Sequence, residues 1–329
     1  MRYIVLLCLL LSCALVHASD TGQSRAETAG RSLIGQPAPR MVVKTIDGQT
    51  IDLGALYGKK AVYLKFWATW CVPCREQMPH FERTFEQAGP DMAVIAIDVG
   101  FDDSVDEVRK YRQAVGLGMP IVFDDGTLGE AFHLRVTPQH VVIGRDGRIL
   151  YVGHEANDKL EAALAQARTS SSANVAIAAA PKDEPHYDVG DRVPAFQVHT
   201  LDGKSVPAFG ATPGQPTALL FLSPWCESYL VKSRPALAES CRAARERAEV
   251  LARQSGVRWL GVASGLWANR DELAAYQREH HIAMPLALDD SGALFRRFRV
   301  MHVPTVIVLD GKGKVVRRTE EVNEAALPL

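Results

Sequence analysis

The chain has 329 residues, of which 47% are hydrophobic, and its 37 basic and 38 acidic side chains give a net charge of −1. This balance excludes the strongly basic surface typical of nucleic-acid-binding proteins. The length and the apolar content suit two globular domains. Six cysteines are too few for a disulfide-rich scaffold. We therefore expect cysteine to serve chemistry in this chain.

The N-terminus predicts export. Arg2 is followed by a mostly apolar stretch, Ile4 to Val16, that is too short to span a bilayer, and His17 and Ala18 complete a small-residue cleavage pattern. We expect residues 1–18 to be a signal peptide. The mature chain is then expected to carry no transmembrane segment.

Two further expectations concern the region around the cleavage site. Cys13 weakly resembles a lipoprotein processing site, but apolar residues continue past it, so soluble export is preferred. Residues 19–32 are polar and predicted to be disordered. Cleavage would leave four cysteines, which are Cys71, Cys74, Cys226 and Cys241.

Residues 33–167 form the first predicted domain. Extended apolar segments at 62–67 and 92–97 flank a helix over about 71–87, which predicts a parallel β-α-β unit, and a second helix is expected over 105–115. A hairpin of strands 140–143 and 148–152 follows, turned through Asp146 and Gly147. The pattern predicts a mixed sheet with helices on both faces.

A CxxC motif stands between the first of these strands and its helix. Cys71 and Cys74 would lie on one helical face with Cβ atoms about 5 to 6 Å apart, which permits a reversible disulfide. Cys71, nearer the helix N-terminus, is predicted to be the nucleophile and Cys74 the resolving thiol. Pro73 suits the first helical turn. A zinc site would need a second ligand pair that the sequence lacks, and a purely structural disulfide closing so short a loop would stabilise little.

The sequence of this domain recurs as an internal repeat. Trp70 and Cys71 recur 155 residues later as Trp225 and Cys226, and a longer series of matches is offset by 165 residues. Such ordered repetition implies two copies of one fold. Residues 168–188 are rich in serine, alanine and proline and read as a flexible linker, and residues 189–329 form the second domain. Its hairpin is expected at 305–309 and 314–316, and its first helix is expected to be longer.

The motifs of the first copy resemble the TlpA-like, or redoxin, branch of the thioredoxin superfamily. They are GQPAP at Gly35 to Pro39, IDGQTIDL at Ile46 to Leu53, FWATWCVPC at Phe66 to Cys74, and Pro138 after Val136 and Thr137. The resemblance implies an α/β fold of two tandem thioredoxin-like domains. It also implies that Pro138 is a cis-proline facing the dithiol, and that Thr137 before it pairs with a client chain.

Function follows from the same resemblance. It implies an exported thiol-disulfide oxidoreductase that needs no organic cofactor, acts on protein thiol and disulfide clients in the periplasm, and is recharged as a reductant by a membrane-bound partner. Trp70 and Pro73 would support the site. The alternatives are a disulfide oxidant or isomerase, and a module that binds copper or a client while the first domain keeps its thiols reduced.

Two positions depart from the family pattern. Lys65 stands where thioredoxins usually have a buried acid, and Gln77 stands where many TlpA-like proteins have a glutamate, with Glu76 beside it. A cation near the dithiol would favour the thiolate. Equally, Lys65 could extend to solvent and Gln77 could lie on the helix surface.

The second copy departs further. Tyr229 replaces the second cysteine of the motif, while Pro304 after Val303 keeps the cis-proline position. Cys241 would lie about 22 Å from Cys226 along one continuous helix. A disulfide between them would need that helix to break at Pro235, so we expect two free thiols and a single-thiol client site.

The second copy also has features of two other kinds of site. Ser223, three residues before Cys226, resembles the hydroxyl position of peroxiredoxins, although Leu219 stands where that pattern has a proline. Cys226 with His302, and with His280 or His281, would suit copper. Lone histidines more often have ordinary surface roles, so no metal site is assigned.

Overall fold

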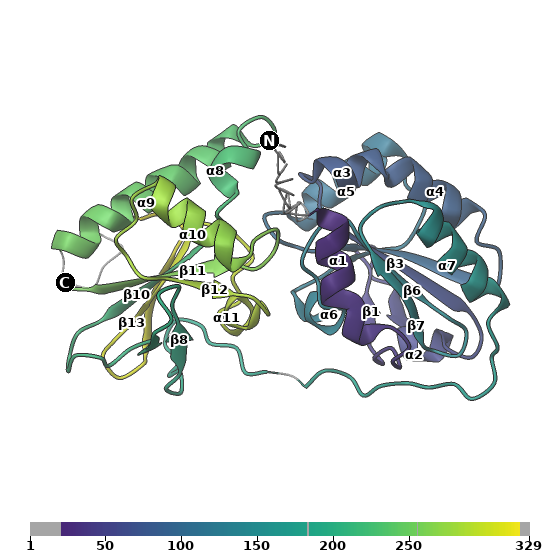
Figure 1. Ribbon diagram of the computed structural model, residues 1–329, viewed down its shortest axis with the longest axis horizontal. Coiled ribbons are helices and arrows are strands. Elements are labelled where there is room, and N and C mark those ends of the chain that lie inside the picture. The colour runs from purple at the N-terminus through teal and green to yellow at the C-terminus, as the bar shows by residue number, and fades with distance from the viewer. Residues whose placement is uncertain (1–20, 183, 255, 323–329) are drawn as a thin grey trace, which may run out of the picture.

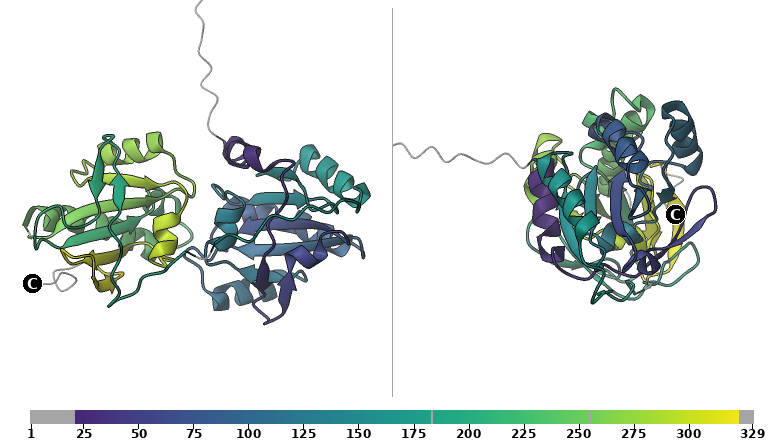
Figure 2. Two further views of the ribbon diagram at one scale, coloured as in Figure 1. Left: turned by 90° about the horizontal axis from the view of Figure 1, so that it is seen from below. Right: turned by 90° about the vertical axis from the view of Figure 1, so that its right-hand side faces the viewer.

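The computed structural model describes residues 21–182, 184–254 and 256–322 and contains two similar domains joined by one connection (Figure 1). The predicted signal peptide lies outside the described residues. Figure 2 shows the two domains side by side, each with a central sheet and helices around it. Within the described part of the chain, no helix is long and apolar enough to cross a membrane.

The first domain is built on a five-stranded mixed sheet in the order β5-β4-β3-β6-β7. The three parallel strands β3, β4 and β5 continue into the antiparallel pair β6 and β7. A small separate hairpin of β1 and β2 is linked to β5 by a bridge between Thr45 and Val122. The strand bounds are β1 Val42–Lys44, β2 Thr50–Asp52, β3 Ala61–Trp67, β4 Met92–Asp98, β5 Ile121–Phe123, β6 Gln139–Ile143 and β7 Ile149–Gly153.

Helices of the first domain cover this sheet, and β3 at its centre is buried along its whole length. The helices are α1 Gly22–Gly30, α2 Leu53–Leu56, α3 Val72–Glu76, α4 Met78–Glu86, α5 Val105–Val115, α6 Thr127–Ala131 and α7 Asp158–Thr169. Helix α5 matches its predicted range because Ser104 and Glu107 form a capping box and Gly116 ends the helix in the left-handed region, at φ 77°. The parallel β-α-β unit and the hairpin are confirmed.

Two expectations for the first domain are wrong. Residues 19–32 are predicted to be disordered, but within the described residues from 21 onward α1 packs on β7, and Gln23 Oε1 accepts the N–H groups of His154 and Glu155, just after β7, at 2.8 Å each. Residues 19 and 20 lie outside the described residues. The helix expected over 71–87 is interrupted at Gln77. Pro79 explains the interruption, since its ring would clash with a carbonyl one turn earlier and it has no N–H to donate.

The second domain repeats the sheet in the order β12-β11-β10-β13-β14. Its strands are β8 Gln197–His199, β9 Ser205–Pro207, β10 Thr217–Leu222, β11 Arg258–Ser264, β12 Leu286–Asp289, β13 Thr305–Leu309 and β14 Val315–Thr319, and its helices are α8 Cys226–Tyr229, α9 Pro235–Gln254, α10 Arg270–Glu279 and α11 Ala293–Arg297. Helix α9 has 20 residues where α4 has 9, so the expected longer helix is present.

The connection between the domains is partly attached to the first one. The amide of Ala176 donates to the Asp146 carbonyl at 2.8 Å, and the amide of Ala178 donates to the Ala38 carbonyl at 3.0 Å. The chain then crosses to the second domain along the lower edge of Figure 1. Part of the predicted linker, residues 168–188, is therefore bound to the first domain.

Ion pairs bind the two domains to each other. Arg234, in the break between α8 and α9, places its guanidinium 2.6 Å from the buried Asp103 carboxylate and 2.9 Å from the Thr69 hydroxyl of the first domain. Arg296 pairs with Glu130 at 2.6 Å. These contacts hold the CxxC end of the first domain against the second domain.

Candidate active site

The CxxC motif forms a disulfide at the start of α3. The Cα atoms of Cys71 and Cys74 are 5.2 Å apart, and Cys71 is the N-cap residue whose Sγ accepts the Cys74 N–H at 3.2 Å. Pro73 lies in the first turn, as predicted. An N–H that points at Sγ favours the thiolate after reduction. The local geometry thus suits Cys71 as the ionised sulfur.

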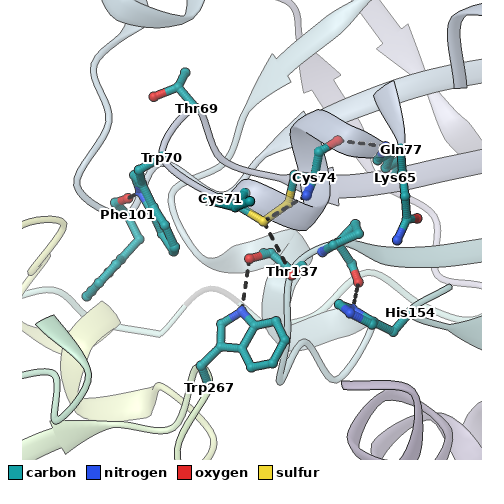
Figure 3. Close-up of a disulfide and its surroundings, with 12 residues drawn as sticks. Lys65, Thr69, Trp70, Cys71, Cys74, Gln77, Phe101, Thr137, His154 and Trp267 are labelled. Atoms are coloured by element: carbon teal, nitrogen blue, oxygen red, sulfur yellow. Dashed lines mark hydrogen bonds between the residues drawn. A yellow bond between two sulfur atoms is a disulfide. The ribbon is translucent and has the colours of Figure 1, made fainter. Parts of the chain in front are cut away.

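The loop before β6 faces this disulfide. The Thr137–Pro138 peptide bond is cis, and the Thr137 carbonyl oxygen lies 3.4 Å from Cys71 Sγ (Figure 3). His154 Nδ1 donates to the Pro138 carbonyl at 2.7 Å and so fixes the loop from behind. The structure therefore brings Thr137 and Pro138 to the nucleophile, as the resemblance implied.

Trp70 borders the site on the side of the second domain. Its indole Nε1 donates to the Phe101 carbonyl at 2.8 Å, and its ring lies 5.0 Å from that of Trp225, measured between centroids. Cys71 is only 1% exposed and Cys74 is fully buried. In this arrangement the disulfide is closed to solvent.

Lys65 lies beneath the disulfide and does not reach solvent. It is fully buried, its Nζ donates to the Cys74 carbonyl at 3.3 Å, and it stands 5.4 Å from the centre of the Phe81 ring. Burial lowers the pKa of this lysine to about 7. The interpretation of Lys65 as a solvent-directed residue is wrong. Near neutral pH its amine is present in both protonation states, so it is suited to exchange a proton near Cys74.

Gln77 is not a plain surface residue either. Its Oε1 accepts from His140 Nε2 at 2.8 Å, and His140 Nδ1 accepts from the Tyr63 hydroxyl at 2.8 Å. Burial, with the neighbouring Lys65 charge, holds the pKa of His140 well below its usual range. The imidazole is therefore neutral.

His140 is a site residue that the sequence reasoning missed. In the antiparallel pairing of β3 with β6 it stands directly opposite Lys65. Residues opposite one another in such a pair share a face of the sheet. The sequence did contain a signal for His140. It follows the expected cis-proline by two residues, and the strand pairing sets it opposite Lys65, six residues before Cys71.

The second domain holds a disulfide as well. Cys226 and Cys241 are bonded with Cα atoms 6.3 Å apart, so the expectation of two free thiols is wrong. The chain breaks between α8 and α9, and α9 begins at Pro235, which returns Cys241 to Cys226. The Val303–Pro304 bond is cis, and the Val303 carbonyl oxygen lies 3.8 Å from Cys241 Sγ.

The copper interpretation receives no support from these positions. The Cys226 sulfur is held in the disulfide, and His302 Nδ1 lies 3.6 Å from a carboxylate oxygen of Asp102 in the first domain. The ring of His280 packs on that of Tyr276, with ring centroids 4.7 Å apart. Within residues 21–182, 184–254 and 256–322, no three histidine, cysteine or acidic side chains gather in a way that could hold a metal ion.

Comparison with known proteins places these two sites in a family. The model of the AhpC/TSA family matches twice, over residues 34–152 and 189–318. The chain belongs to this family. Each match covers one five-stranded sheet and contains one disulfide with its cis-proline, so the repeat predicted from the sequence is a repeat of the family domain.

Curated relatives are similar to a part of this chain about as long as one family domain. The chain is 32% identical over 133 residues to the thioredoxin-like protein YneN of Bacillus subtilis, covering 40% of this chain and 78% of that protein. It is 34% identical over 128 residues to the thiol-disulfide oxidoreductase ResA of Halalkalibacterium halodurans, covering 38% of this chain and 71% of that protein. Among solved structures, a thioredoxin-family thiol:disulfide interchange protein from Chlorobium tepidum is 25% identical to the chain, with a TM-score of 0.37. The match covers 41% of this chain and 97% of that one. The protein is a thiol-disulfide oxidoreductase of the thioredoxin type with two thioredoxin-like domains.

The buried lysine predicts how stability depends on pH. Because the pKa of Lys65 is lower in the folded protein than its ordinary value of 10.5, the unfolded chain binds more protons between about pH 7 and pH 10. The free energy of unfolding of the wild type, relative to Lys65→Met, should therefore rise with pH by about 1.4 kcal/mol per unit across this window. Denaturant unfolding of both oxidised proteins at several pH values measures this difference.

Lys59 provides the matched control, since its side chain is exposed. Lys59→Met should follow the wild type at every pH. A constant difference between Lys65→Met and the wild type from pH 7 to pH 10 would contradict the burial of a partly neutral amine.

Proposed function

We propose that this protein is exported to the periplasm, where it reduces disulfides of client proteins and is recharged by a membrane-bound reductant. Residues 33–167 are its catalytic domain, 168–188 its linker and 189–329 a second domain. The support for export is the predicted signal peptide at residues 1–18. The support for the catalytic role is the approach of the Thr137 carbonyl to Cys71 Sγ, at 3.4 Å, beside a disulfide that can open.

The reaction needs only thiol chemistry. The Cys71 thiolate attacks one client sulfur and forms a mixed disulfide, and the other client sulfur leaves as a thiolate and takes a proton. Cys74 loses its proton and attacks Cys71 Sγ, which expels the second client thiolate. Two electrons have then passed from the dithiol to the client, and the Cys71–Cys74 disulfide is restored.

Lys65 and Gln77 support the second half of this cycle. The neutral amine of Lys65 accepts the Cys74 proton, since its pKa is about 7 and it touches the backbone of Cys74. Gln77, at the end of α3, is fixed by the 2.8 Å hydrogen bond between its side chain and that of His140. Trp70 and Pro73 shape the turn that presents Cys71.

A client chain binds against Thr137 and Pro138 only when the second domain moves. Trp267 of the second domain donates its indole N–H to the Thr137 hydroxyl at 3.1 Å and so occupies this position (Figure 3). The second domain therefore regulates access to the dithiol, and the ion pairs of Arg234 and Arg296 must open for turnover.

The roles of the two cysteines can be separated by trapping. Cys74→Ser should accumulate mixed disulfides through Cys71, because the resolving thiol is missing, whereas Cys71→Ser should trap nothing. Non-reducing gels and peptide mapping after thiol quenching measure the adducts. Equal trapping by both variants would remove the proposed assignment.

The direction of electron flow is set by the reduction potential of the Cys71–Cys74 pair. A reductant should have a potential near that of thioredoxin, about −270 mV, whereas an oxidant of exported proteins would have one near −120 mV. Equilibration of the pair with glutathione or dithiothreitol buffers, followed by alkylation and mass spectrometry, gives the value. A potential near −120 mV would replace the reductase proposal with the oxidant or isomerase alternative.

A further inference from the structure

The disulfide of the second domain occupies the position of an active-site disulfide. Cys241 Sγ lies 3.8 Å from the carbonyl oxygen of Val303, the residue before the cis-proline. Cys71 Sγ has the same relation to the Thr137 carbonyl in the first domain. The second copy has lost its CxxC sequence, but α9 supplies a sulfur to the same place from another part of the chain.

The two disulfide faces are turned toward each other by a pseudo-twofold interface. Trp70 packs against Trp225, its counterpart in the repeat, with ring centroids 5.0 Å apart. The residues that follow these tryptophans are Cys71 and Cys226. A contact between equivalent residues lies on the dyad of an isologous interface. The N-terminal cysteines of both copies are thus beside that axis.

Backbone hydrogen bonds repeat the same symmetry. The amide of Asp102 donates to the Met301 carbonyl at 2.8 Å, and the amide of Trp267 donates to the Arg135 carbonyl at 2.8 Å. Asp102 and Trp267 are equivalent in the repeat, and both have left-handed backbone, with φ of 54° and 57°. Each domain therefore uses one loop to bind the loop that precedes the cis-proline of the other domain.

Side chains extend the pairing to the cis-proline loops. Trp267 Nε1 donates to the Thr137 hydroxyl at 3.1 Å, and an Asp102 carboxylate oxygen accepts the Val303 N–H at 3.0 Å. Each domain contacts the other at the residue before its cis-proline, where the proposed function places a client. Each domain is bound in the other's client position.

We propose that the Cys226–Cys241 disulfide is a second redox-active centre and that its exchange partner is the Cys71–Cys74 dithiol of the same chain. This rests on the proposed function, because it requires Cys71 to act as a nucleophile. An external dithiol first reduces the Cys71–Cys74 disulfide. The Cys71 thiolate then attacks a sulfur of the second-domain disulfide and forms an interdomain disulfide, and the other sulfur of that pair leaves as a thiolate and takes a proton.

Cys74 completes the transfer. Having lost its proton, it attacks Cys71 Sγ, so the Cys71–Cys74 disulfide returns, the interdomain bond breaks, and the second domain is left with two thiols. Two electrons have moved from the first domain to the second. Tyr229 must shift for this step, since its hydroxyl accepts the Val72 N–H at 3.0 Å and its ring stands 6.3 Å from that of Trp70.

Burial keeps solution thiols from both disulfides while the domains are docked, since Cys71 is 1% exposed, Cys226 is fully buried and Cys241 is 8% exposed. An external dithiol, like a client, therefore meets the Cys71–Cys74 disulfide only when the second domain moves. In the relay, the electrons then reach the second-domain pair through Cys71. A buried disulfide with a structural role alone would instead be reduced without regard to Cys71.

The test compares reduction of the second-domain disulfide in the full-length wild type and in Cys71→Ser. Oxidised protein is mixed with dithiothreitol, samples are quenched with acid and alkylated, and the Cys226 and Cys241 peptides are followed by mass spectrometry. The relay predicts that reduction is at least tenfold slower in Cys71→Ser. Equal rates in both proteins, including no reduction in either, would overturn the proposal.

Cys74→Ser supplies an independent readout. Its Cys71 should form a bond to Cys226 or Cys241 within the same chain, found as a cross-linked peptide in monomeric protein, and Cys71→Ser should give none. The absence of that peptide from Cys74→Ser, with the Cys226–Cys241 bridge intact, would also overturn the relay. Insulin reduction by the wild type in the same buffer keeps the two proposals apart, because activity on insulin without reduction of the second-domain disulfide rejects the relay alone.

Discussion

The arrangement of this protein depends on one interface between its two domains. The loop at Asp102 in the first domain binds the cis-proline loop of the second, and the loop at Trp267 in the second domain binds the cis-proline loop of the first. The two backbone hydrogen bonds, each 2.8 Å long, and the packing of Trp70 on Trp225 place both disulfides at one interface. A buried backbone N–H needs a partner, so neither loop can leave its position without loss. The closure of Cys71 follows from this contact.

The same contact explains the burial of one acid, Asp103. Asp103 is buried because Arg234 of the second domain and Thr69 of the first both bind its carboxylate. An unpaired buried carboxylate would be costly. The acid therefore belongs to the docked form, and separation of the domains exposes it to water. Docking and local electrostatics are linked at this end of the sheet.

Beneath the dithiol, basic groups replace the acid that the family resemblance led us to expect. Lys65 and His140 face each other across β3 and β6, and both lose basicity through burial. A neutral amine accepts a proton as a carboxylate does, but it leaves the site without a negative charge that would oppose thiolate formation. The exchange of acid for lysine thus keeps a proton acceptor near Cys74 and removes the negative charge that a carboxylate acceptor would carry.

Local patterns were sufficient for much of the fold. Extended apolar segments predicted β3 and β4, and Asp-Gly turns between apolar segments predicted the two hairpins. The turn at Asp146 and Gly147 is where the sequence indicated it. The repeat predicted two domains of one type. Both cis-proline positions followed from the family motif.

Features that depend on tertiary packing were not accessible in the same way. Pro235 was recognised as a place where a helix could break, but only the packed chain decides whether Cys241 returns to Cys226. Helix α1 has a polar composition and forms because Gln23 binds the chain after β7. Trp267 escaped notice because nothing in its neighbourhood of the sequence indicates that it reaches the other domain.

The most direct test of the face-to-face arrangement is hydrogen exchange at the amides of Asp102 and Trp267 in the oxidised full-length protein. Both donate across the interface, so both should be strongly protected, and Trp225→Ala, which removes the ring packed on Trp70, should reduce their protection together. Exchange of both amides in the wild type at the rate of an open loop would contradict the account.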